Sequence, residues 1–109
     1  MMDKFDDRYI LLQSMYEDSF FPQYLTDKVK WQLIRLIEFL ETDERDVHIL
    51  QEKFDEFTLF VNSLQQEFAD HDSELDTVAR ESIIASLDYI LHWFKIDIPV
   101  ETAVREREW

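Results

Sequence analysis

The chain of 109 residues contains no glycine. Glycine is the residue that most readily forms tight turns and left-handed helix caps, and phosphate-binding loops depend on it. Its absence argues against hairpin-rich β folds and excludes the glycine-dependent nucleotide motifs. The sequence therefore favours helices joined by short polar turns.

Cysteine is also absent. Disulfide frameworks, thiol catalysis and cysteine-ligated zinc are thereby excluded. Residues 1–8 carry charge where a secretory signal would have an apolar core, and no apolar run approaches the length of a membrane span. We therefore expect a cytoplasmic protein with no membrane contact.

Basic residues are few: 11 lysines and arginines face 25 acidic residues, for a formal net charge of −14. This charge repels phosphate backbones and anionic membranes, so direct nucleic-acid binding is not expected. A basic protein partner fits the same charge. The acidic surface could equally serve only to keep the protein in solution.

Hydrophobic residues make up 46% of the chain and aromatic residues 15%. This content is enough for a packed core and argues against disorder. At this length, with no linker or internal repeat, residues 1–109 are expected to form a single helical-bundle domain. Rings that the core does not take up must face a partner.

Apolar residues recur at helical spacing in four long segments. We predict an all-α antiparallel bundle of four main helices plus a short C-terminal helix. The predicted helices are Asp6 to Asp18, Pro22 or Thr26 to Leu40, Val47 to Ala69, Ser73 to Phe94, and Val100 to Glu108. Thr42 or Asp43 is the expected N-cap of the third helix, and Ser73 begins a capping-box pattern for the fourth.

Several stretches in the same order resemble a family of small acidic bacterial proteins that is filed as a domain of unknown function. The stretches are Met15 to Pro22, Thr26 to Lys30, Glu74 to Glu81 and Arg107 to Trp109. That family often has a glycine where this chain reads Trp93-Phe94-Lys95-Ile96. The resemblance implies a bacterial, all-helical protein and brings no catalytic residue with it.

Three histidines are the only candidates for nitrogen ligands of a metal: His48, His71 and His92. Each follows a carboxylate by four residues, whereas di-iron bundles use a Glu-x-x-His spacing on two helices. No serine lies in a strained nucleophile motif. We therefore predict no metal, no cofactor and no catalytic residue, and hence a protein that is not an enzyme.

Acidic residues gather at two predicted turns, which should lie at opposite ends of the bundle, and some aromatic rings lie off the core stripes. Such rings are frequent anchors in interfaces. Trp109 either folds back onto the bundle or engages a partner. The predicted partner-binding residues are Glu41, Asp43, Glu44 and Asp46 at one turn, Asp70 and Asp72 at the other, and the rings of Trp31 and Trp109.

Arg80 lies in the second turn of the predicted fourth helix. It could form a surface ion pair with Asp76 or with neighbours of Glu81. Alternatively, it could be buried and hold the loop before Pro22, with Asp18 or Asp27 as its partner. The sequence leaves both interpretations open.

The leading hypothesis is a non-enzymatic bacterial protein that binds another protein, in its most concrete form an immunity or antitoxin-like inhibitor of a basic partner. One alternative is a small homodimer of structural or regulatory type, with Trp31, Phe60 or Trp93 in the twofold interface. A second alternative is a DNA mimic, with Glu52, Asp55 and Glu56 joining the acidic turns into a stripe.

Overall fold

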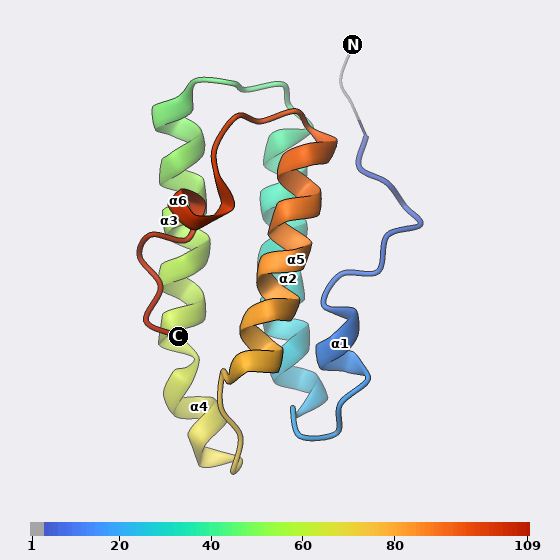
Figure 1. The fold of residues 1–109 in the computed structure, drawn as a ribbon, viewed down its shortest axis with the longest axis vertical. Helices are drawn as coiled ribbons and strands as arrows, with labels where there is room; N and C mark the ends of the chain where they lie inside the picture. Colours follow the sequence, from blue (N-terminus) through green and yellow to red (C-terminus); the bar gives the residue numbers. More distant parts are fainter. Residues whose placement is uncertain (1–3) are drawn as a thin grey trace.

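Three long helices run alternately up and down the molecule in the computed structural model, which describes residues 4–109 (Figure 1). Helices α2 (Gln23–Leu40) and α5 (Thr77–Trp93) run in one direction, and α3 (Val47–Ser63) runs in the other. The short helices are α1 (Gln13–Tyr16), α4 (Gln65–Asp70) and α6 (Val100–Ala103). The all-α antiparallel bundle is confirmed, and residues 4–109 contain no strand. Residues 1–3, which begin the charged stretch discussed above, lie outside the described residues.

The expected first helix, Asp6 to Asp18, is confined to the single turn α1. The preceding residues 4–12 form a non-helical N-terminal strap that follows α5 (Figure 1). Leu12 has a φ of 57°, a left-handed conformation that an α-helix does not accommodate. Its main-chain nitrogen donates a hydrogen bond to Ser86 Oγ on α5 at 3.0 Å. The prediction of a fourth long helix was therefore wrong at this segment.

Aromatic contacts between the strap and α5 explain why residues 4–12 do not form a helix. The Tyr9 ring stacks on Tyr89 at a centroid distance of 3.9 Å, and Phe5 packs edge-on against Trp93. Tyr89 Oη donates to Asp6 Oδ2 at 2.6 Å. These contacts with α5 replace the local bonds of a helix, and apolar periodicity alone does not reveal them.

The third expected helix, Val47 to Ala69, is divided at Leu64 into α3 and α4. The Ser63 hydroxyl donates to the carbonyl oxygen of Phe60 at 2.5 Å. The Leu64 nitrogen instead donates to the Val61 carbonyl, one residue closer than an α-helix requires. A serine that competes for a main-chain carbonyl in this way weakens the helix locally.

Aspartates cap α3 and α5, and in both helices the N-cap differs from the residue expected from the sequence. Asp46, not Thr42 or Asp43, is the N-cap of α3, and Asp76, not Ser73, is the N-cap of α5. Asp76 Oδ1 accepts a hydrogen bond from the Ala79 nitrogen at 3.1 Å. A free carboxylate can satisfy the exposed amides of a first turn as well as a serine does. Several candidate caps in succession therefore leave the exact start undetermined.

Left-handed helix caps occur here without glycine. Asp72 follows α4 with a φ of 56°, and Lys95 follows α5 with a φ of 57°. In both places a Schellman pair of hydrogen bonds closes the helix, as when the Ile96 nitrogen donates to the Leu91 carbonyl at 2.9 Å. Lys95 lies in the stretch where the resembling family often has glycine. The chain therefore keeps the turn and accepts a lysine in it.

The last helix is also shorter than expected, since α6 ends at Ala103 rather than near Glu108. Residues 104–109 form an irregular C-terminal tail that returns beside α3 (Figure 1). Asn62 binds the tail on both sides, because its Nδ2 donates to the Glu106 carbonyl at 2.7 Å and its Oδ1 accepts from the Glu108 nitrogen at 3.0 Å. Side chains of α3 thus provide the hydrogen bonds that a longer helix would have made.

The hydrophobic core joins buried residues from all three long helices, the strap and the tail. Phe54 of α3 and Phe68 of α4 are its largest fully buried side chains. Within residues 4–109, no helix combines the length and the apolar character needed to cross a membrane.

Candidate protein-binding surfaces

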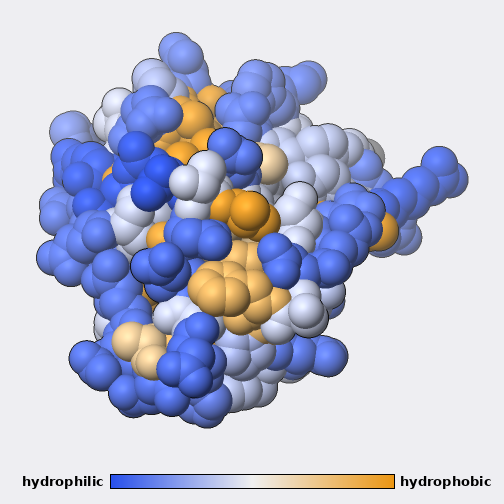
Figure 2. Space-filling view, turned by 60° about the horizontal axis from the view of Figure 1, so that its bottom comes forward, coloured by the Kyte–Doolittle hydropathy of each residue, from blue (hydrophilic) through white to orange (hydrophobic). Residues whose placement is uncertain are grey.

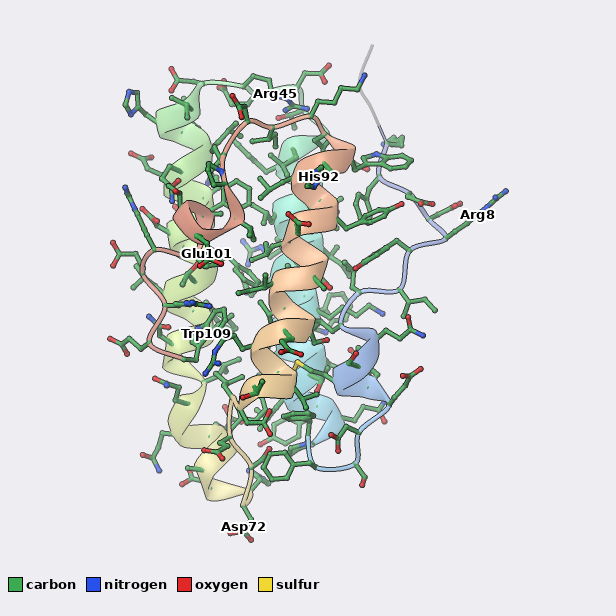
Figure 3. All side chains as sticks on the ribbon, viewed as in Figure 1. Arg8, Arg45, Asp72, His92, Glu101 and Trp109 are labelled. Carbon is green, nitrogen blue, oxygen red and sulfur yellow. The ribbon has the colours of Figure 1, made fainter. Side chains whose placement is uncertain are left out.

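The acidic residues predicted to bind a partner lie at opposite ends of a molecule 44 Å long. Glu41, Asp43, Glu44 and Asp46 connect α2 to α3, and Asp70 and Asp72 lie where α4 ends (Figures 1 and 3). The two groups therefore cannot form one continuous contact site, and each end has to be considered separately.

At the α2–α3 connection, carboxylates bind the protein's own main chain. Asp46 Oδ1 accepts from the nitrogens of His48 and Ile49 at 2.9 and 3.3 Å. Glu44 Oε2 accepts from the next two main-chain nitrogens, at 2.9 and 3.0 Å. Glu41 Oε2 accepts from the Phe5 nitrogen of the strap at 2.8 Å. These three side chains are occupied in holding the fold.

The carboxylates at the opposite end form few hydrogen bonds within the protein. Asp70, Asp72 and Glu74 are exposed, and together they are called the acidic end below. Within residues 4–109, Asp70 accepts one hydrogen bond, from the Gln66 amide at 2.9 Å, and the side chains of Asp72 and Glu74 accept none. The Asp72 side chain points away from the bundle (Figure 3). The acidic end is thus the better candidate for meeting a cationic partner.

Two partly exposed rings accompany the acidic end. Tyr24 is 42% exposed, and its ring lies edge-on to the His71 ring at a centroid distance of 5.4 Å. Phe20, in the α1–α2 loop at the same end, is 40% exposed. Seen from this end, hydrophilic residues surround small hydrophobic patches (Figure 2). Rings beside unoccupied carboxylates are a suitable composition for an interface.

A small polar network fixes the Tyr24 ring. Tyr24 Oη donates to Glu67 Oε2 at 2.9 Å, and Lys28 Nζ lies 3.0 Å from Glu67 Oε1. The hydrogen bonds from Lys28 and Tyr24 hold the pKa of Glu67 below its ordinary value. Partial burial, together with Glu67, raises the pKa of Tyr24. Glu67 is therefore ionised at neutral pH and keeps the ring oriented.

The tryptophans have three different environments. Trp31 on α2 is 63% exposed and remains a candidate anchor. Trp93 is 39% exposed, and its position is fixed by the strap, because its Nε1 donates to the Lys4 carbonyl at 2.8 Å and its ring packs on Phe5. Trp109 is only 8% exposed. Of the two alternatives for Trp109, the structure shows the ring folded back onto the bundle. The prediction of Trp109 as a partner-binding residue is corrected accordingly, because a buried ring cannot serve as an exposed anchor.

Arg80 forms neither of the expected ion pairs. Its Nε donates to the main-chain oxygen of Trp109 at 3.2 Å. The sequence interpretations with Asp76, or with Asp18 or Asp27, were wrong because they did not foresee that the tail returns to α5. Arg80 and the buried ring together fix the position of the tail.

Two of the histidines contact oxygen atoms of the residue four positions earlier in the chain. His71 Nδ1 is 3.0 Å from the Glu67 carbonyl oxygen, and His92 Nδ1 is 3.5 Å from Asp88 Oδ1. In the described part of the chain, no three or more histidines, aspartates and glutamates come together as a metal ion would require.

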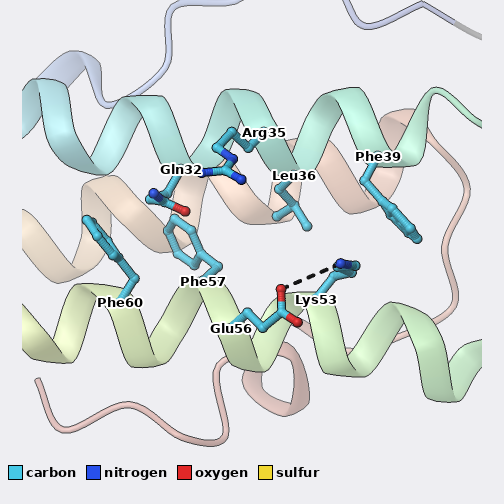
Figure 4. Close-up of a pocket in the computed structure, with 8 residues that line it drawn as sticks. All are labelled: Gln32, Arg35, Leu36, Phe39, Lys53, Glu56, Phe57 and Phe60. Atoms are coloured by element: carbon cyan, nitrogen blue, oxygen red, sulfur yellow. Dashed lines mark ion pairs between the residues drawn. The ribbon is translucent and has the colours of Figure 1, made fainter.

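A groove between α2 and α3 escaped the sequence interpretation. It is open, has a volume of about 480 Å³, and carries Arg35 from α2 and Lys53 from α3 (Figure 4). Phe39, Phe57 and Phe60 provide its apolar surface. The helical spacing of Gln32, Arg35 and Phe39 could have indicated that they share one side of α2. The sequence interpretation gave more weight to the acidic clusters and did not use this spacing.

A comparison with protein families matches residues 5–109 to the model described as "Family of unknown function (DUF5713)". The chain belongs to this family. Neither the curated proteins nor the solved structures contain a match to it. Membership in DUF5713 agrees with the resemblance to a domain of unknown function and covers the strap, the bundle and the tail alike. It assigns no role to any residue.

Proposed function

We propose that this DUF5713 protein is a non-enzymatic binding module of the bacterial cytoplasm, and that it captures a basic protein partner at the acidic end. Its most concrete form is an immunity or antitoxin-like inhibitor, which would cover a cationic surface of a toxin. The observation that carries the proposal is the exposed trio Asp70, Asp72 and Glu74 together with the partly exposed ring of Tyr24, which packs on His71 between the two aspartates.

Electrostatics supports this choice of end. Carboxylates that already accept main-chain hydrogen bonds would have to break them to pair with a partner, which is the situation of Glu41, Glu44 and Asp46. The carboxylates at the acidic end have no comparable bonds to lose. Complementary charge accelerates encounter, and aromatic anchors slow dissociation.

The test uses the tagged full chain as bait in extracts of its own organism, with two variants that change the net charge equally. Asp70→Lys with Glu74→Lys reverses the acidic end. Asp7→Lys with Asp97→Lys is the matched control, since both residues are exposed and belong to the strap and to the α5–α6 loop. Asp72 is changed separately to Asn, because asparagine tolerates its left-handed conformation.

The proposal expects a basic protein that the wild type and the control variant retain and the acidic-end variant loses. The captured protein is then purified, and its binding is reconstituted with the wild type and each of the three variants. Capture that is indifferent to reversal of the acidic end, or the absence of any reconstituted complex, would contradict the proposal.

A further inference from the structure

The helix pair α2–α3 is covered on one side only. Helix α5, the tail and the strap lie on one side of the pair, and the other side carries the open groove (Figure 4). Exposed apolar side chains extend this surface beyond the groove. The α2–α3 face is defined here as the groove residues together with Trp31, Ile49 and Leu59, which are 63%, 37% and 52% exposed.

This face differs from the rest of the molecule in its charge. The protein carries −14 overall, yet the groove is lined by two cations, Arg35 and Lys53, and one carboxylate, Glu56. Glu38 and Glu52 are exposed on the same two helices. A protein of high net charge associates with itself least unfavourably through a surface where the signs balance.

The cations in the groove are weakly engaged by their own chain. Lys53 Nζ is 3.6 Å from Glu56 Oε2, an exposed contact, and lies over the Phe39 ring at 5.0 Å from its centroid. Within residues 4–109, Arg35 takes part in none of the side-chain hydrogen bonds or ion pairs. Its five donors are available to carboxylates of another molecule.

A second copy provides what this face lacks. In a twofold interface the same patch is used on both molecules, so it must contain both members of each attractive pair. The α2–α3 face does so, with cations, carboxylates and aromatic rings along two antiparallel helices. Docking the α2–α3 pair of a second copy on this face would produce a four-helix bundle across the interface and would cover the exposed side of the groove.

The size of the face is sufficient for such a dimer. A standard interface buries roughly 800 Å² on each partner. That is about one-eighth of the 6570 Å² accessible surface of this chain. The outer sides of two helices of 18 and 17 residues, each about 26 Å long, can supply it.

We propose that two copies of this protein associate through the α2–α3 face, with Trp31 and Phe60 at the interface and Arg35 paired with carboxylates of the second copy. This surface is distinct from the acidic end, so the dimer leaves that end open. The inference does not rest on the proposed function, and either can fail without the other.

Sedimentation equilibrium of the full chain at about 0.15 M salt tests the proposal, since at that ionic strength charges more than about 8 Å apart are screened. We expect a reversible, concentration-dependent monomer–dimer equilibrium. Trp31→Glu and Arg35→Glu are each expected to weaken the dimer at least about tenfold, as for central interface residues. Ile10→Glu is the control, because Ile10 is 60% exposed on the strap.

Circular dichroism on each variant verifies that the helices remain intact. A monomer at every accessible concentration would overturn the proposal, as would a dimer that Trp31→Glu and Arg35→Glu leave unchanged. Two double variants of opposite charge provide a further test. One carries Arg35→Glu and Lys53→Glu, the other carries Glu38→Lys and Glu56→Lys, and the two proteins are mixed. We expect the mixture to form heterodimers more strongly than either variant forms homodimers, an outcome that altered folding would not produce.

Discussion

The main-chain nitrogen of Ile96 donates a hydrogen bond to the carbonyl oxygen of Leu91 at 2.9 Å, across a left-handed lysine. Lys95 thus occupies the position of a Schellman cap at which glycine is favoured, because a Cβ atom is unfavourable there. We expect Lys95→Gly to raise the free energy of unfolding by about 0.5–1 kcal/mol.

Chemical denaturation measures this effect, and Lys95→Ala is its control. Alanine removes the same charge but keeps the Cβ atom, so it should give no comparable gain. A stability of Lys95→Gly equal to or below that of Lys95→Ala would show that the left-handed cap is not strained.

Arg105 of the tail forms two hydrogen bonds with Asp55 on α3, at 3.1 and 2.7 Å. Burial raises the pKa of Asp55, but the hydrogen bonds from Arg105 and Gln51 outweigh it, so the pKa lies below its ordinary value. A carboxyl whose pKa is lowered on folding stabilises the folded state above its unfolded pKa. This contribution is lost as the pH falls through the folded pKa.

We therefore expect Arg105→Ala to lower the denaturation midpoint at neutral pH and to have little effect once the pH has fallen below the lowered pKa of Asp55. Denaturant unfolding of wild type and variant across this range gives the difference directly. A difference that stays constant down to the acidic limit would mean that packing of the arginine side chain, not the ion pair, holds the tail.

Tyr16 Oη donates to Asp27 Oδ1 at 2.5 Å, joining α1 to α2. Burial, followed by this carboxylate, strongly raises the pKa of Tyr16. A tyrosine with a raised pKa contributes its stability fully below the unfolded pKa, and the contribution is lost as the pH rises through the folded value. The wild type should thus become less stable above about pH 10.

Tyr16→Phe removes both the hydrogen bond and the ionisation. We expect it to cost about 1.5–3 kcal/mol at neutral pH, the range for a hydrogen bond to a charged group. It should also lose stability less steeply than the wild type on the alkaline side. Denaturation at several pH values tests both parts, and parallel alkaline losses in the two proteins would assign the effect to other residues.

Much of the fold follows from the sequence, because α2, α3 and α5 each bury an apolar stripe at helical spacing. The strap and the tail do not. Their conformations depend on pairs far apart in the chain, such as Tyr89 with Asp6 and Asn62 with Glu106. Periodicity describes one segment at a time and cannot detect such pairs.

The candidate binding surfaces were anticipated only in part. The sequence identified the acidic turns and placed them at opposite ends of the molecule, as they are. It could not tell which carboxylates bind their own main chain, so Asp46 and Asp72 looked equivalent. It also gave Trp31 and Trp109 the same status, although one ring is exposed and the other is buried.

Capture at the acidic end is tested by the association rate of the purified basic partner with the wild type, the Asp70→Lys/Glu74→Lys variant and the Asp7→Lys/Asp97→Lys control. Opposite charges that face each other across an interface accelerate encounter, and salt screens them. We expect reversal of the acidic end to slow association at least about tenfold at low salt, while the control variant associates at a rate near that of the wild type. Equal rates for the two variants would contradict capture at the acidic end.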